Sequence, residues 1–120
     1  MTQNPNQVSL VAESRDHGIV GFINGTHGRE EHLKHYCEVW SLYLLAKYHG
    51  KRIGFNLLKR YFDLHIQQGY SKAYVWVLEN NPSIKFYEKA GGKYTGQEKE
   101  EEIAGQKHKE LMYIWDDINL

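Results

Sequence analysis

The chain has 120 residues, of which 41% are hydrophobic and 13% aromatic, and its 15 basic and 15 acidic side chains cancel at neutral pH. This length and composition predict one domain with a hydrophobic core, residues 1–120, and argue against general disorder. A neutral chain has no overall electrostatic attraction to nucleic acid or to an anionic membrane, and no apolar run approaches the roughly 20 residues of a membrane helix. The single cysteine, Cys37, excludes an internal disulfide framework, so we expect a soluble cytoplasmic domain.

Three strands are predicted in the first half of the chain, after a polar lead-in at residues 1–7 that lacks the features of a signal peptide. The apolar runs 8–14 and 18–26 flank a turn, which indicates a hairpin. The polar and charged stretch 27–35 indicates an exposed connection. Residues 36–45 are rich in aromatic and branched side chains and form the strongest of these predicted strands.

The second half begins with the pattern of a helix that buries one face and ends at Gly69. The predicted core positions of this helix are Ile53, Leu57, Leu58, Tyr61, Phe62 and Ile66. The apolar run 73–78 follows it, and a strand after a helix predicts a β-α-β unit with a parallel strand pair. Asn81 and Pro82 suit the N-cap and first position of a short helix, 83–90.

A hairpin of two strands, 94–102 and 107–115, is predicted to end the fold, with a turn at residues 104–105. The resulting order is β-β-β-α-β-α-β-β. It predicts an α/β domain with a mixed sheet.

Residues 48–54 lie between a predicted strand and a predicted helix, and they carry the first functional signal. A chain that turns through glycines into a helix directs free backbone N–H groups and the helix dipole at one point, which suits phosphate oxygens. Gly50 and Gly54 allow close approach, and Lys51 and Arg52 add charge. Two glycines alone are more typical of a tight turn with solvated cations. Their spacing disfavours ATP and NAD sites.

Residues 42–44 and 48–54 together resemble the acetyl-CoA pyrophosphate motif of the GNAT superfamily of N-acetyltransferases. That motif has Gln or Arg, two variable residues, Gly, one residue, and Gly or Ala after the fourth strand. The matching positions are His49, Arg52 and Gly54, of which the first two depart from the motif. Residues 80–92 are similar to the family's "Asn…Phe-Tyr-Glu-Lys-Leu-Gly" segment, in which asparagine reaches the pantetheine arm and tyrosine lies by the CoA sulfur.

The resemblance implies a GNAT-like, mostly antiparallel mixed sheet around a β-α-β unit that binds acetyl-CoA. It implies a shortened member, because the family's first strand and helices, which help to form the acceptor groove, precede the hairpin predicted here. The cofactor-binding residues that it implies are Leu42, Leu44, His49, Gly50, Lys51, Arg52, Ile53, Gly54, Asn80 and Asn81. The backbone groups of Leu42 and Leu44 would pair with pantetheine and polarise the acetyl carbonyl.

Direct transfer within a ternary complex is the mechanism that the resemblance implies. Tyr87 would protonate the departing thiolate, although a packed helix tyrosine is the alternative. Glu38 is the predicted base that deprotonates the acceptor, and a carboxylate paired at the strand edge is an equal alternative. Cys37 is read as a buried hydrophobe rather than a nucleophile.

Other patterns in the chain favour simple structural roles. The spacing of His27, His32, His35 and Cys37 fits no standard zinc site, so no metal is expected. The acidic run 98–102 is expected to be a solvated strand edge. The tryptophans at positions 40, 76 and 115 are expected in the core.

The sequence therefore predicts an acetyl-CoA-dependent N-acetyltransferase whose acceptor is a primary amine on a small molecule or a peptide. The alternatives are a non-catalytic acyl-CoA-binding or regulatory module of the same fold, and an interaction domain without a ligand. A homodimer is expected, because the first strand would leave an uncovered sheet edge.

Overall fold

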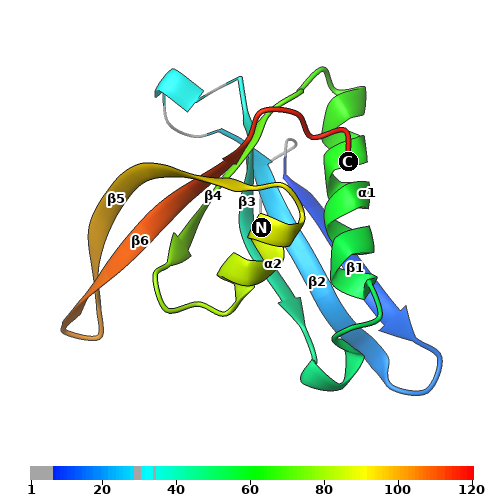
Figure 1. Ribbon diagram of the computed structural model, residues 1–120. Coiled ribbons are helices and arrows are strands. Elements are labelled where there is room, and N and C mark those ends of the chain that lie inside the picture. Colours follow the sequence, from blue (N-terminus) through cyan, green and yellow to red (C-terminus); the bar gives the residue numbers. More distant parts are fainter. Residues whose placement is uncertain (1–6, 29–30, 34) are drawn as a thin grey trace.

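The computed structural model describes residues 7–28, 31–33 and 35–120, which form one twisted six-stranded sheet with two α-helices (Figure 1). The strands are β1 (Val8–Ser14), β2 (Gly18–His27), β3 (Cys37–Leu44), β4 (Ala73–Leu78), β5 (Lys93–Ile103) and β6 (Gln106–Trp115). The helices are α1 (Ile53–Gln67), α2 (Ser83–Lys89) and the short 3-10 helices η1 (Glu31–Leu33) and η2 (Ala46–Tyr48). The predicted order of strands and α-helices is confirmed.

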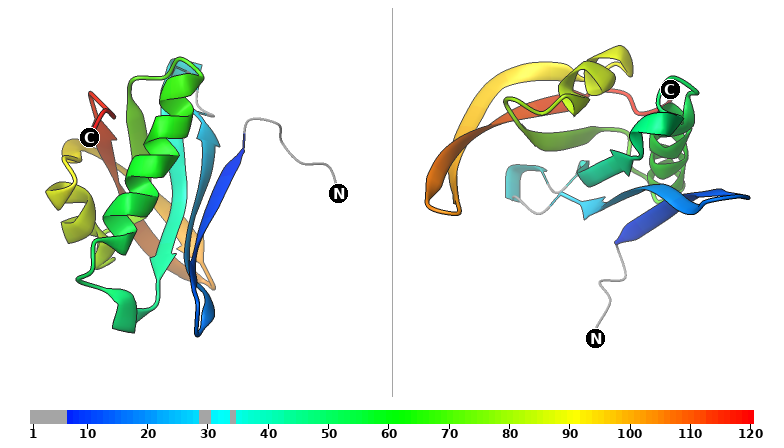
Figure 2. Two further views of the ribbon diagram at one scale, coloured as in Figure 1. Left: turned by 90° about the vertical axis from the view of Figure 1, so that its right-hand side faces the viewer. Right: turned by 90° about the horizontal axis from the view of Figure 1, so that it is seen from below.

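The sheet has the order β1-β2-β3-β4-β6-β5, and β3 and β4 are the one parallel pair among the described strands. Helix α1 connects these two strands, as the predicted β-α-β unit requires. Both α-helices lie on the same face of the sheet (Figure 2). The fold class predicted from the sequence, a mixed and mostly antiparallel sheet around a β-α-β unit, is confirmed.

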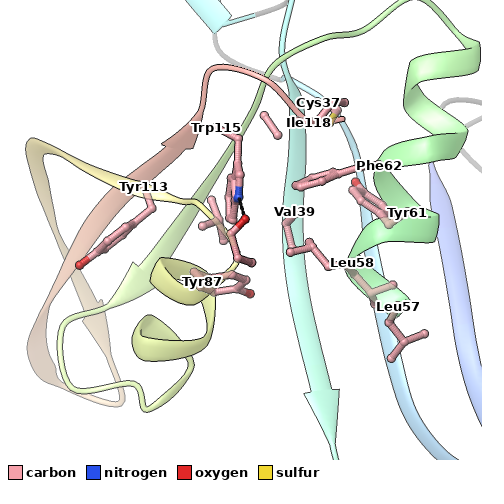
Figure 3. Packing of buried hydrophobic residues seen from close by; sticks show 14 of the residues in the cluster. Cys37, Val39, Leu57, Leu58, Tyr61, Phe62, Tyr87, Tyr113, Trp115 and Ile118 are labelled. Carbon is pink, nitrogen blue, oxygen red and sulfur yellow. Dashed lines mark hydrogen bonds between the residues drawn. The ribbon is translucent and has the colours of Figure 1, made fainter. Parts of the chain in front are cut away.

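The main core lies between the sheet and the two α-helices (Figure 3). Leu58, Tyr61 and Phe62 of α1 are fully buried, and the ring centroid of Phe62 lies 5.3 Å from that of Trp115 on β6. Each fully buried side chain of this kind contributes about 1.5–3 kcal/mol through loss of water contact. The core therefore fixes α1 across the strands whose ends form the site described below.

The apolar stripe of α1 corrects one prediction, because its last buried position is His65 and not Ile66. His65 is fully buried, one turn after Tyr61, whereas Ile66 is 37% exposed. His65 lies four residues after Tyr61 and therefore on the same face of α1. Helix geometry thus buries this residue even though its side chain is polar. Neither ring nitrogen of His65 has a hydrogen-bond partner among the described residues.

The opposite face of the sheet corrects a second prediction, that residues 27–35 form an exposed connection. Leu33 of η1 is buried with Tyr74 and Met112, and Tyr36 packs beside them. The apolar side chains of β4 and β6 on this face need a cover, and the connection supplies it. Residues 29, 30 and 34 of that stretch lie outside the described residues.

A β-bulge in β3 changes the direction in which its later side chains point. The register with β2 pairs Gly25 with Val39 and then Asn24 with Ser41, so Trp40 is an extra residue. Before the bulge, Val39 faces the helices. After it, Leu42 does, and it packs against the same core.

No helix among the described residues is long and apolar enough to cross a bilayer.

The buried His65 predicts a specific loss of stability in acid. Burial lowers its pKa from 6.5 to about 4, with a smaller effect from His27, and the rings of Tyr61 and Tyr70 complete its surroundings. The unfolded chain therefore binds a proton at a pH where the folded chain does not. The free energy of unfolding that depends on a neutral His65 is therefore fully present above pH ~6.5. It falls by about 3 kcal/mol as the pH falls to ~4.

Urea unfolding of wild type and of His65→Leu between pH 7.5 and 4 measures the pH-dependent part of the free energy of unfolding that is due to His65. We expect the free energy of unfolding of the variant to fall by about 3 kcal/mol less than that of wild type. Parallel pH profiles for the two proteins would contradict the assignment.

Candidate functional site

The site is built where β3 and β4 separate. The two parallel strands pair at three positions, Cys37 with Ala73, Glu38 with Tyr74 and Val39 with Val75. Beyond Val75, β4 continues its pairing with β6, while β3 stays with β2 (Figure 1). The diverging strands leave an opening in the middle of the sheet. Backbone groups on its edges lack the strand partner that a continuous sheet would give.

Two backbone positions on β3 point into this opening. The amide of Leu45 donates to the Val20 carbonyl at 2.9 Å, on the β2 side. Because backbone groups of successive strand residues alternate between edges, those of Leu44 and Leu42 point the other way, toward β4. The His49 ring lies 2.8 Å, Nε2 to oxygen, from the Leu44 carbonyl and satisfies that one acceptor.

A groove of about 630 Å³ follows the helix side of this opening. It runs between β3, the start of α1 and α2. Its lining residues are Leu42, Leu44, His49, Gly50, Arg52, Ile53, Gly54, Phe55, Pro82, Ser83, Phe86, Lys89 and Ala90. Both polar and apolar side chains line the groove, as a ligand with a charged end and an apolar part requires.

The turn before α1 directs positive potential into the groove. Gly50 and Arg52 both have left-handed backbones, with φ of 79° and 62°, and α1 begins at the next residue, Ile53. The amide groups of the first helical turn have no intrahelical acceptor, and that turn carries no acidic side chain. Arg52 stands where the family motif has glycine. Its left-handed φ explains that preference, since a side chain costs about 1–2 kcal/mol there.

Cations surround the same turn on its outer side. The amino groups of Lys47 and Lys51 lie 5.5 Å and 5.6 Å from the centroid of the Tyr48 ring, and Lys47 also contacts His17. These side chains lie beside the groove rather than in its lining. The turn can therefore hold an anion through backbone amides and Arg52, with the lysines adding longer-range attraction.

A second cavity of about 320 Å³ continues through the opening toward the other face of the sheet. Its lining residues are Trp40, Ser41, Leu42, Val75, Trp76, Val77, Leu78, Asn81, Ser83, Tyr87, Ile103 and Glu110. Leu42 and Ser83 line both hollows, so the groove and the cavity adjoin at these two residues.

Tyr87 reaches this junction from α2. Its side chain is 3% exposed, and its ring meets Trp115 edge to face at 5.7 Å between centroids (Figure 3). The Trp115 indole donates from Nε1 to the Ala90 carbonyl at 3.1 Å, which fixes the end of α2. Burial raises the pKa of Tyr87 from 10 to about 12, so its hydroxyl keeps its proton at any physiological pH.

Most of the site residues predicted from the sequence come together here. The groove lining includes Leu42, Leu44, His49, Gly50, Arg52, Ile53 and Gly54, and the cavity lining includes Asn81 and Tyr87. Asn81 also caps α2, accepting from the Ser83 amide at 2.8 Å. Lys51, Asn80 and Glu38 belong to neither lining. Glu38 is buried and accepts a hydrogen bond from the Trp40 indole, Nε1 to Oε1, at 3.3 Å.

Several residues of the site were not predicted from the sequence. Glu110 of β6 and Ile103 of β5 reach the cavity only because the last hairpin crosses this part of the sheet. Trp40 and Trp76 were expected in the core, but both are half-buried and line the cavity. Glycine at position 54 also has a packing role that was not predicted. A Cβ there would lie 3.3 Å from the Phe86 ring, so glycine lets α2 approach α1 closely.

Comparison with known proteins identifies the class. The chain belongs to the acetyltransferase (GNAT) family, whose profile matches residues 1–92. It is 31% identical over 110 residues to the uncharacterized N-acetyltransferase YuaI of Bacillus subtilis. That match covers 92% of this chain and 63% of the relative, so the chain spans less than two thirds of that relative's length.

Solved structures share the fold. Nourseothricin acetyltransferase superposes with a TM-score of 0.76 at 16% identity, covering 92% of this chain and 65% of that protein. An aminoglycoside 6'-N-acetyltransferase in complex with coenzyme A gives a TM-score of 0.74 at 17% identity, covering 96% of this chain and 74% of that protein.

Proposed function

We propose that this chain transfers the acetyl group of acetyl-CoA to a primary amine by direct attack within a ternary complex. The observation that carries the proposal is the junction of the groove with the cavity at Leu42 and Ser83, inside the opening between β3 and β4. A donor in one hollow and an acceptor in the other would bring their reacting atoms together there. Holding two reactants in such contact lowers the barrier without any covalent enzyme intermediate.

The groove suits acetyl-CoA in both of its parts. The pyrophosphate fits the turn of Gly50 and Arg52, where backbone amides and the start of α1 attract anions. The pantetheine arm fits the edge of β3, where the backbone of Leu42 and Leu44 lacks a neighbouring strand. An amide-bearing arm would take the place of that strand. The Leu42 amide would then lie close enough to the thioester to polarise its carbonyl.

Tyr87 supplies the proton that the leaving sulfur needs. Its raised pKa makes it a weak acid, so proton delivery assists a reaction whose main driving force is positioning and carbonyl polarisation. A thiolate with a pKa of ~8.5 still gains from a neighbouring hydroxyl, because a hydrogen bond stabilises the charge as it develops.

The role of the turn predicts the effect of Arg52→Gly on CoA binding. Glycine accepts the left-handed backbone, so the fold is retained, while the charge at the groove is lost. We expect calorimetry to show about tenfold weaker CoA binding, since a charged hydrogen bond contributes about 1.5–3 kcal/mol. Lys51→Ala removes the same charge outside the groove lining and should weaken binding by less than threefold. Equal losses of CoA affinity in the two variants would mean that the turn acts only through its net charge. Unchanged affinity in both variants would show that the turn does not bind CoA.

The role of Tyr87 predicts that Tyr87→Phe separates binding from turnover. The ring and its packing on Trp115 are kept, so CoA affinity should stay within about twofold, while thiol release with a panel of primary amines falls about 10²-fold. Tyr113→Phe is the matched control, because Tyr113 is also buried on the helix face but lines neither hollow. Unchanged turnover would leave Tyr87 with packing alone. CoA binding by wild type without turnover on any amine would make the chain an acyl-CoA-binding module.

A further inference from the structure

The cavity carries a carboxylate that the proposed mechanism has not used. Glu110 of β6 is opposite Leu78 of β4 and opposite Lys99 of β5, on the sheet face away from the α-helices. It is partly buried and lines the cavity whose other wall includes Tyr87. One carboxylate therefore faces the space into which an acceptor would pass on its way to Tyr87.

The walls beside Glu110 are aromatic. Trp40 and Trp76 line the same cavity, from the two strands that separate. The Trp76 ring already attracts a cation, because the Lys99 amino group lies 4.3 Å from its centroid. An aromatic face next to a carboxylate is the combination that binds an ammonium group with an apolar carbon skeleton.

Burial and charges from two other strands, β3 and β5, set the pKa of Glu110. Burial raises its pKa from 4.5 to about 6, with a hydrogen bond and like charge from Glu101, and Glu38 adds a smaller repulsion. Lys99 acts in the opposite direction. The carboxylate is thus charged at neutral pH, yet it binds a proton more readily than an ordinary glutamate, as a general base needs.

We propose that Glu110 binds the ammonium group of the acceptor and takes its proton, which makes it the acceptor-recognition residue and the base of this enzyme. The inference rests on the proposed function. The acceptor class is a primary amine on a flat or apolar skeleton, which lies against Trp40 and Trp76. Glu38, the base expected from the sequence, lies outside the cavity lining, and its negative charge adds to the effects that raise the pKa of Glu110.

The proton balance is complete with these groups. The ammonium gives one proton to Glu110, which releases it to solvent. The neutral nitrogen then bonds to the thioester carbon, the carbon–sulfur bond breaks, and the sulfur takes the Tyr87 proton. The second proton that the nitrogen loses returns to Tyr87.

Amine binding tests the assignment without turnover. The probes are 2-phenylethylamine and its uncharged analogue 2-phenylethanol, titrated calorimetrically into the full chain saturated with CoA. We expect the amine to bind at least tenfold more tightly than the alcohol at pH 7.5. Its affinity should fall about tenfold by pH 5, because a carboxyl with a pKa of about 6 is then mostly protonated while the amine stays charged.

Glu110→Gln should weaken amine binding about tenfold at pH 7.5 and remove its pH dependence, with unchanged CoA affinity and unfolding midpoint. Glu100→Gln is the matched control, because Glu100 is opposite Lys109 and therefore faces the other side of the same hairpin. A Glu110→Gln chain with wild-type amine binding overturns the proposal, as does loss of the pH dependence in Glu38→Gln instead. Normal CoA binding without amine binding also overturns it, whereas failure to bind CoA overturns the proposed function.

Discussion

The early end of the pairing between β3 and β4 is the constraint on which the rest of the structure depends. Three residue pairs hold the strands together, and beyond them each strand follows a different neighbour. The bulge at Trp40 then turns Leu42 toward the helices, where it borders both hollows. Unpaired backbone on a strand edge is costly unless a partner covers it, and His49 covers one carbonyl. The same deficiency that would weaken a sheet makes this edge a place for a ligand.

The opening also separates two kinds of charge. Cations and helix N–H groups gather at the turn of Gly50 and Arg52, on the helix side of the sheet. Carboxylates gather on the opposite face, where Glu110 and Glu101 lie together. An anionic donor and a cationic acceptor would therefore enter from different sides. Tyr87 lies between these two regions and stays protonated because it is buried. The chain is neutral overall, so this separation arises from placement rather than from composition.

Local pattern predicted the elements well and the cavity poorly. The strand β4 and the turn into α1 follow from periodicity and glycine spacing, because both depend on neighbours in sequence. The sequence predicted Ile66 rather than His65 in the core and an exposed connection at residues 27–35. Helix geometry buries His65 instead, and the need to cover a sheet face buries Leu33. Glu110 reaches the cavity through long-range pairing of the last hairpin, which no local pattern encodes. The homodimer expected from the sequence stays a prediction.

Amide hydrogen exchange of β3, followed by NMR with and without CoA, tests the central claim most directly. The amides of Leu42 and Leu44 point into the opening, whereas that of Tyr43, between them, faces β2. If the pantetheine arm takes the place of a strand, CoA should slow exchange at Leu42 and Leu44 by about tenfold or more and leave Tyr43 unchanged. Slowing of all three alike, or CoA binding without slowing at Leu42 and Leu44, would contradict the account.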